Sequence, residues 1–268
     1  MSCEKVKIYV GSGVFFLMLT ILGMAIFSSQ GDEEHTRDRV REVYSEKASE
    51  TGEGISLFGL HADIRNSGEV LVSVKVEFVV KGEVITWGVP LAIPTGHRVY
   101  KGADPVSGRS ILDNESSSKT KLRTFTVNQV LLDGKDMPYE LIEGSSVVTR
   151  IYPKSRPKEL SKGKHVLEVQ YKLEGAVEVS NDGVVLDFPI VSSHLLSPVK
   201  RVSASFSLPK DIQMDWVRAE GFLGSRKDPV KGVLNKLDLP RSSINFWTSR
   251  PLAPLEGMFI TVKWPAPF

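Results

Sequence analysis

The side chains that could carry chemistry in this chain are histidines, serines and carboxylates. The five histidines are scattered and show none of the H-x-H, H-x₃-H or H-E-x-x-H spacings that place metal ligands together: His35, His61, His97, His165 and His194. Ser192, Ser193 and His194 offer a hydroxyl beside an imidazole, but consecutive strand residues point to opposite faces. The sequence therefore predicts neither a metal centre nor a nucleophile with its base.

Paired carboxylates are the remaining route to catalysis, because glycan hydrolysis needs two carboxyl groups about 5–10 Å apart. Candidates lie around one predicted hairpin and after a later strand: Glu174, Glu178, Asp182, Asp187, Asp211 and Asp215. An envelope hydrolase would need Glu174, Asp187 and Asp215 in one cleft, whereas solvated strand ends are the simpler interpretation. Neither G-x-S-x-G nor a phosphate-binding glycine loop occurs, so no catalytic residue and no cofactor is predicted.

Exposed aromatic side chains are the other functional candidates. The four tryptophans are spread along the predicted strands, and core packing is expected for each: Trp87, Trp216, Trp247 and Trp264. Phe246 and Trp247 are adjacent, so one of them must face outward from a regular strand. The outward member of this pair is the predicted interface residue, since large exposed aromatics are typical of interfaces.

Composition narrows the function classes further. The chain has 34 basic and 32 acidic residues and a net charge of +2, which gives no reason to expect nucleic-acid binding. Cys3 is the only cysteine, so an internal disulfide and a cysteine-based zinc site are both excluded. The stability of the soluble part must therefore come from its core.

An uncharged run at residues 8–31 predicts a membrane anchor. About twenty apolar residues at roughly 1.5 Å each can cross the hydrocarbon core of a bilayer. The prediction is a cytoplasmic tail at 1–7, a transmembrane anchor in lipid at 8–28, a polar stalk with room for a short helix at 29–54, and an extracytoplasmic domain at 55–268. Cleavage after Ala25 or Ser29, which would release a periplasmic binding module, is the alternative.

After the predicted stalk, apolar residues recur at every second position, which is the pattern of half-buried β-strands. Val70, Val72, Val74, Val76 and Phe78 alternate with other residues after an Asn-Ser-Gly-Glu turn, so 55–64 and 70–80 read as a hairpin. Later strands are expected at 163–177, pairing with 183–191, at 199–209 and as a terminal pair. No long amphipathic helix is seen. We predict an all-β fold, an antiparallel sandwich, with a division into two lobes near 136–160 left open.

These strands also resemble a known family. The stretches GKHVLEVQYKLEGAV and VKRVSASFSLP, and the ending RPLAPLEGMFITVKWPAPF, are similar to the extracytoplasmic module of the bacterial "predicted membrane protein" family, domain of unknown function 2207. The residues that match its pattern are Gly163, His165, Val169, Tyr171, Leu173, Leu208, Pro209, Arg250, Pro251, Leu252, Glu256, Gly257, Trp264 and Pro265. Leu186, Asp187 and Phe188 stand where the family often has Tyr-Trp-Asn. Family members usually continue into further membrane spans, so the resemblance implies location and fold rather than a reaction.

The sequence therefore predicts a non-enzymatic role. The expected function is that of a membrane-anchored extracytoplasmic interaction module, a subunit of a membrane or cell-envelope assembly. The expected partner is a protein, with a glycan or cell-wall polymer as another option. The alternative is the hydrolase with non-local carboxylates.

Overall fold

The computed structural model describes residues 30–85, 89, 91–94, 96–97, 121–122, 124–145, 148–153, 160–180, 183–225 and 228–265. The predicted anchor at 8–28 and Trp87 lie outside these ranges. Within them, no helix combines the length and apolar character needed to cross a bilayer. The chain divides into two compact units, Met1–Glu42 and Val43–Phe268.

The helix α2, Gln30–Thr51, occupies most of the range for which the sequence predicts a polar stalk or short helix. Its C-terminus has a defined stop. The Gly52 N–H donates to the Ala48 carbonyl at 2.9 Å, and Gly52 takes a left-handed conformation with φ of 69°. The Thr51 hydroxyl donates to the Lys47 carbonyl at 2.7 Å. These bonds satisfy carbonyls of the last turn and turn the chain into the first strand.

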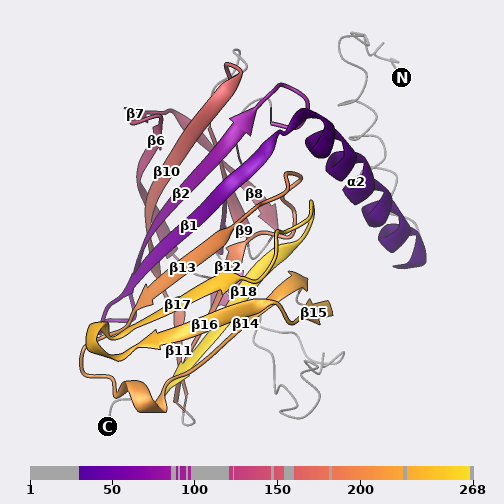
Figure 1. Ribbon diagram of the computed structural model, residues 1–268. Coiled ribbons are helices and arrows are strands. Elements are labelled where there is room, and N and C mark those ends of the chain that lie inside the picture. Colours follow the sequence, from indigo (N-terminus) through magenta and orange to yellow (C-terminus); the bar gives the residue numbers. More distant parts are fainter. Residues whose placement is uncertain are drawn as a thin grey trace, which may run out of the picture. The chain divides into compact units, whose positions relative to one another are not determined.

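Two large sheets form the body of the second unit (Figure 1). The larger sheet contains eight strands: β1 (Gly54–Ile64), β2 (Val70–Val80), β6 (Thr124–Leu132), β7 (Lys135–Asp136), β10 (Gly163–Glu174), β13 (Val202–Ser207), β16 (Val233–Asp238) and β17 (Ser243–Thr248). Their spatial order is β16-β17-β13-β1-β2-β10-β6-β7. The predicted β1–β2 hairpin is confirmed, and Val70 faces Ile64 at its turn.

The second large sheet and the smaller ones complete the described strands. The second sheet contains β11 (Val177–Ser180), β12 (Gly183–Val191), β14 (Arg218–Ser225), β15 (Asp228–Val230) and β18 (Gly257–Trp264). Their spatial order is β11-β12-β18-β14-β15. A third has the order β3-β9-β8, with bounds Leu91–Pro94, Val148–Pro153 and Tyr139–Ser145. The strands β4 (Gly96–His97) and β5 (Lys121–Leu122) pair with each other. Short 3-10 helices lie at Met214–Trp216 and Leu239–Arg241.

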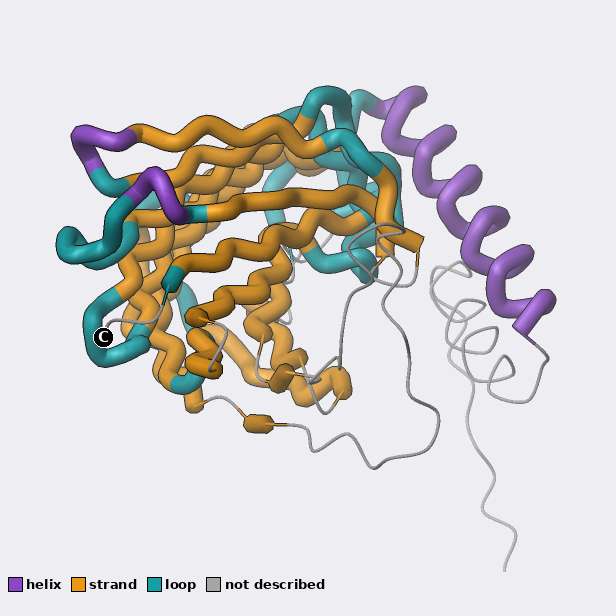
Figure 2. The backbone as a smooth tube through the Cα atoms, turned by 90° about the horizontal axis from the view of Figure 1, so that it is seen from below, coloured by secondary structure: helices purple, strands orange, loops and turns teal. Residues whose placement is uncertain are grey.

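A single hydrophobic core lies between the layers that Figure 2 shows as orange strands. The rings of Phe188 in β12 and Phe206 in β13 pack edge to face, with 5.6 Å between their centroids. Phe206 packs against Phe246 of β17 in the same way, with 5.8 Å between the centroids. Buried residues from both sides of 136–160 belong to this core, Ile93 and Ile151 among them. Within the described residues, the segments on both sides of the division that the sequence left open therefore share one core.

One strand pair departs from the predicted antiparallel arrangement. β1 pairs with β13 in parallel, with Phe58 opposite Val202 and Ala62 opposite Phe206. The other strand pairs of the described sheets are antiparallel. The sandwich prediction therefore holds in its mostly antiparallel character and is wrong for this pair.

The alternation of apolar and polar residues correctly predicted which side chains of the central strands face the core. The exception is the buried histidine of β10, His165. In β2 every second residue from Val70 to Val80 is buried. In β10 Leu167 is buried, His165 shares its face and Val166 is only half-buried. Alternation is thus regular through β10, with a histidine at a core position.

The predicted partnership of 163–177 with 183–191 is wrong. β10 lies in the large sheet between β2 and β6, whereas β12 pairs with β11 and β18 in the other sheet. β11 is the strand that pairs with β12 instead, with Ser180 opposite Gly183. The predicted terminal pair is also split, since β17 and β18 belong to different sheets.

A buried carboxylate ties the start of β1 to the loop that leaves β2. Glu53 is 3% exposed, and its two carboxylate oxygens accept five backbone N–H groups at 2.7 to 3.2 Å: those of Lys81, Gly82, Glu83, Val84 and Ile85. Burial raises the pKa of Glu53, but these hydrogen bonds outweigh it and hold the pKa below the ordinary value of 4.5. The carboxylate therefore organises a loop whose N–H groups would otherwise be unsatisfied.

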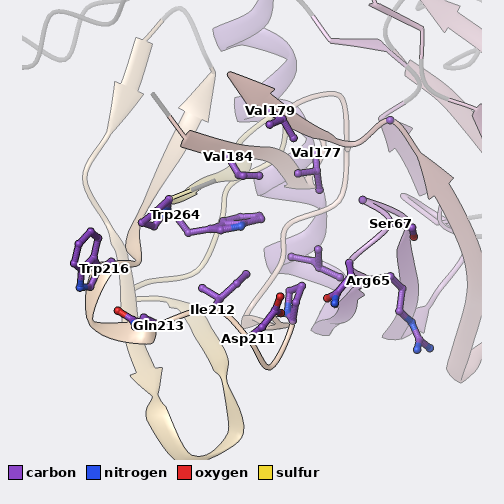
Figure 3. A pocket seen from close by; sticks show the side chains of 16 residues that line it. Arg65, Ser67, Val177, Val179, Val184, Asp211, Ile212, Gln213, Trp216 and Trp264 are labelled. Carbon is purple, nitrogen blue, oxygen red and sulfur yellow. The ribbon is translucent and has the colours of Figure 1, made fainter. Parts of the chain in front are cut away.

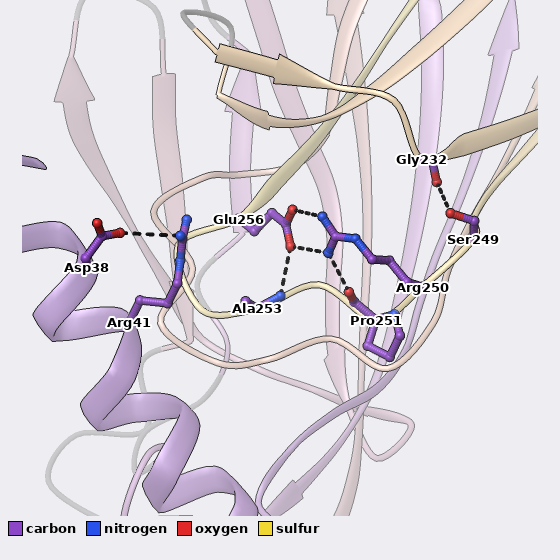
Figure 4. Close-up of polar contacts among 8 residues, drawn as sticks. All are labelled: Asp38, Arg41, Gly232, Ser249, Arg250, Pro251, Ala253 and Glu256. Carbon is purple, nitrogen blue, oxygen red and sulfur yellow. Dashed lines mark hydrogen bonds and ion pairs between the residues drawn. The ribbon is translucent and has the colours of Figure 1, made fainter.

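The loop between β17 and β18 is closed by an ion pair, drawn in Figure 4. Arg250 donates through both terminal nitrogens to the two oxygens of Glu256, which is buried, and the Ala253 N–H donates to Glu256 Oε2 at 3.0 Å. Leu252 exchanges two backbone hydrogen bonds with Val199. The loop is thereby fastened to the segment that precedes β13.

Gly257 follows this loop at a point of close backbone approach. A Cβ at Gly257 would come within 2.9 Å of both the Ser193 nitrogen and the Val191 carbonyl oxygen, and 3.1 Å of the Gly224 carbonyl oxygen. These backbone atoms of Val191, Ser193 and Gly224 cannot yield as a flexible side chain can. Glycine at this position is therefore required by packing.

Replacing Glu53 by glutamine should destabilise the protein by about 2–3 kcal/mol near neutral pH, because the amide supplies one acceptor oxygen and no charge. The folded pKa of Glu53 is lowered, so its contribution is complete above pH 4.5 and declines as pH falls through the folded value. The penalty should shrink accordingly in acid. Urea unfolding of the detergent-solubilised chain, followed by circular dichroism, measures it.

Glu83→Gln is the matched control, since the Glu83 side chain is exposed and only its backbone meets Glu53. Its effect should stay within about 0.5 kcal/mol. Equal effects of the two substitutions would contradict the assigned role of Glu53.

Candidate functional site

A pocket of about 460 Å³ lies at one end of the sandwich (Figure 3). It is built from four separate parts of the chain, the turn between β1 and β2, the segment around β11 and β12, the loop after β13, and the end of β18. The lining residues are Ile64, Arg65, Asn66, Ser67, Gly68, Gly175, Val177, Val179, Val184, Pro209, Asp211, Ile212, Gln213, Trp216, Trp264 and Pro265. Its volume is within the range of about 300–1,000 Å³ typical of ligand sites.

Local turns place these residues. The Gly68 N–H donates to the Arg65 carbonyl at 2.9 Å, and Gly68 adopts φ of 80°, which reverses the chain between β1 and β2. On the opposite wall the Ile212 N–H donates to the Pro209 carbonyl at 3.2 Å, and the 3-10 helix follows directly. The polar turn and the tryptophan-bearing loop therefore face each other across the pocket.

The pocket has an aromatic floor and an apolar wall. Trp264 is 7% exposed, and its indole lies between the valines of β11 and β12 and Ile212 in Figure 3. Trp216 and Val179 stand at the rim with 59% and 72% of their surfaces exposed. Exposed apolar side chains of this size next to a concave surface are typical of binding sites.

Several polar groups of the pocket have no partner among the described residues. None of these residues accepts a hydrogen bond from Trp264 Nε1, although the indole is buried. Within the same part of the chain, the Asp211 carboxylate has no ion pair and the Gln213 amide no hydrogen bond. Arg65, by contrast, pairs with Asp63 at 3.2 Å. The polar lining thus combines a buried indole donor, an exposed carboxylate and a paired arginine.

The predicted interface pair lies elsewhere. Phe246 is buried in the core, and Trp247 is the outward member, on the outer face of β17. Leu234 of β16 is exposed directly opposite Trp247 in the strand register. The two side chains form a small apolar patch, the Trp247 patch, whose use as an interface stays a prediction.

The carboxylates of the hydrolase alternative are not brought into the pocket. Glu174 pairs with Lys172 at 3.0 Å at the end of β10, whereas Asp187 accepts a hydrogen bond from the Thr261 hydroxyl at 3.0 Å in the other sheet. Asp215 lies on the 3-10 helix and is exposed. None of the three lines the pocket.

A serine and the histidine of the Ser192-Ser193-His194 run lie close together, although the sequence predicted no nucleophile with its base. The distance between Ser192 Oγ and His194 Nδ1 is 3.4 Å. The same hydroxyl accepts the His194 backbone N–H at 3.2 Å, which is the geometry of a serine turn. This contact stabilises a bend.

His165 is the histidine with the most defined environment. Its Nδ1 lies 2.8 Å from Asp133 Oδ2 and its Nε2 lies 2.7 Å from the Ser161 carbonyl, so both ring nitrogens face acceptors. Burial lowers the pKa of His165, but the hydrogen bonds to Ser161 and Asp133 and the Asp133 charge hold it above the ordinary value of 6.5. No group of three or more potential metal ligands occurs in the described part of the chain.

This interaction fixes the tip of the β6–β7 hairpin. Asp133 adopts φ of 53° and Gly134 φ of 75° in the two-residue turn, and Asp133 Oδ1 also accepts the Val166 N–H at 2.9 Å. Burial raises the pKa of Asp133, but the hydrogen bonds from His165 and Val166 and the His165 charge lower it overall. The group is therefore structural and joins β10 to a turn.

His165→Gln should be less stable than the wild type by about 1 kcal/mol at pH 5.5, because the imidazolium donates to both acceptors there. The folded pKa is raised, so this contribution is complete below pH 6.5 and disappears as pH rises through the folded value. The stability gap should therefore narrow with rising pH in urea unfolding series. His61→Gln, an exposed site on β1, should show no such trend, and a pH-independent gap for His165→Gln would contradict the assignment.

Sequence reasoning missed the pocket. Trp216 was placed on a strand and in the core, and it lies exposed on a 3-10 helix. The available hint was the run Pro209 to Trp216, in which a strand ends and polar residues surround an aromatic one. Nothing in it indicates that the β1–β2 turn and the end of β18 would be neighbours.

Comparison with solved structures gives weak likenesses. The yeast LTA4 hydrolase has a TM-score of 0.44 at 11% identity, over 80% of this chain and 29% of that one. The M1 zinc metallopeptidase from Deinococcus radiodurans has a TM-score of 0.36 at 10% identity, over 78% and 42% of the two chains. The chain spans less than half the length of these proteins, and likenesses this weak carry no functional argument.

No curated protein matches the chain. A family model does match, over residues 54–257, from the first strand of the sandwich to the glycine that follows the Arg250–Glu256 loop. The resemblance that the strand patterns suggested is thus confirmed over most of the chain. The protein belongs to the family described as the N-terminal domain of predicted membrane protein DUF2207.

Proposed function

We propose that this chain is a membrane-anchored recognition module, held in the bilayer by residues 8–28, whose extracytoplasmic sandwich binds a partner protein of a membrane or envelope assembly through the Trp264 pocket. The observation that carries the proposal is the pocket itself, with its buried indole donor and its exposed rim. The uncharged run at 8–31 supports the anchor.

The hydrolase alternative has less support. Its carboxylates are held by separate elements outside the pocket, and Asp211 is the single carboxylate among the lining residues. A pair of carboxyl groups facing one substrate is what glycosidic cleavage needs. Recognition without turnover is therefore the function that this geometry supports best.

The orientation can be tested with the only cysteine of the chain. Cys3 should react with a membrane-impermeant maleimide only after permeabilisation, because the proposal places residues 1–7 in the cytoplasm. A Cys3→Ser chain carrying Lys200→Cys is the matched control, since Lys200 is exposed in the sandwich and should be labelled in intact cells. Labelling of Cys3 in intact cells would overturn the proposed orientation.

The binding surface can be tested by substituting the two exposed tryptophans in parallel. Full-length chain purified in mild detergent from its native membranes should retain a stoichiometric protein partner. Trp216→Ala should lose most of it, because a large aromatic side chain that the partner buries carries much of the binding energy, and Trp247→Ala should retain it. Circular dichroism checks that both variants fold. Loss with Trp247→Ala alone would assign the interface to the Trp247 patch instead.

A further inference from the structure

We infer that the Trp264 pocket takes an extended peptide segment that presents an apolar side chain next to a lysine or arginine. This inference rests on the proposed function and names the chemistry of the partner at that site. It follows from three features of the lining, namely a donor, an apolar wall and a charge that no described residue pairs with.

The donor is the indole N–H of Trp264. It is buried at the floor of the pocket, and no described residue accepts its hydrogen bond. An extended segment without internal hydrogen bonds offers free main-chain carbonyls, which are the acceptors this donor lacks. Binding such a segment removes the cost of the unsatisfied group.

The apolar wall is shaped for an extended chain. Val177 and Val179 lie two residues apart on β11 and so share one face, and both line the pocket. β11 is an edge strand among the described strands of its sheet. A peptide in an extended conformation alternates its side chains, so alternate ones can face the apolar wall that Val177 and Val179 form.

The charge of the pocket selects a basic neighbour. Of the two charged lining residues, Arg65 is already paired with Asp63, whereas Asp211 has no ion pair within the described ranges. Asp211 is exposed at the wall beside Ile212. A lysine or arginine next to the inserted apolar residue would complete this pair, and an acidic segment would leave the carboxylate uncompensated.

The probe is a random linear dodecapeptide library displayed on phage and selected on the full-length chain in detergent. Enriched peptides should contain an apolar residue beside lysine or arginine. Trp264→Phe keeps a ring and removes the donor, and it should weaken the enriched peptides about tenfold. Asp211→Asn should weaken them several-fold and flatten the salt dependence of binding. Trp247→Phe is the control and should leave binding within about twofold.

Each outcome decides between the alternatives. If Trp264→Phe folds poorly, Asp211→Asn, on an exposed loop, still tests the site. Equal binding by both pocket variants, or enrichment of no peptide, overturns the peptide assignment. If the native partner is nevertheless lost with Trp216→Ala, the recognition function stands and only its ligand class falls. If cellotriose or chitotriose shifts the Trp264 indole resonance and no peptide does, the ligand is a glycan.

Discussion

The position of β1 is the constraint on which the rest of the sandwich depends. This strand pairs on one side with β2, its neighbour along the chain, and on the other with β13, which comes well over a hundred residues later. Until β13 is in place, one edge of β1 carries unpaired N–H and C=O groups. The first strand of the domain is therefore completed by its last third, and Glu53 fixes where that strand begins.

Alternation in the sequence predicted the strands and their inward residues, because each central strand has one face on the core. The alternation of β2 and of β13, where Val202, Ala204 and Phe206 are buried, was read correctly for this reason. Alternation contains no information on which strand lies beside which. The wrong partner for β10 and the unforeseen parallel pair both arise from this gap. His165 was also unforeseen at a core position, since its burial depends on acceptors that come from Asp133 and Ser161.

The pocket was beyond sequence reasoning for a related reason. Its lining comes from the ends of elements that only the sheet order brings together, such as the turn at Gly68 and the last residue of β18, Trp264. Polar residues in a turn are normally predicted to be exposed to solvent, and a tryptophan near the end of a strand is normally predicted to lie in the core. Trp264 is indeed buried, but its indole donor remains without a partner in the described structure, and this property appears only in three dimensions.

The difference in exposure between Trp216 and Trp264 also means that the intrinsic tryptophan fluorescence of the protein can report on the pocket. Water dipoles reorient around the excited state of an exposed indole, which therefore emits at longer wavelength. An indole enclosed by apolar groups lacks this relaxation and emits at shorter wavelength. Trp216 at the rim and Trp264 at the floor represent these two extremes within one pocket. A ligand that covers Trp216 displaces water from its indole. Binding should therefore shift the tryptophan emission of the unlabelled protein to shorter wavelength.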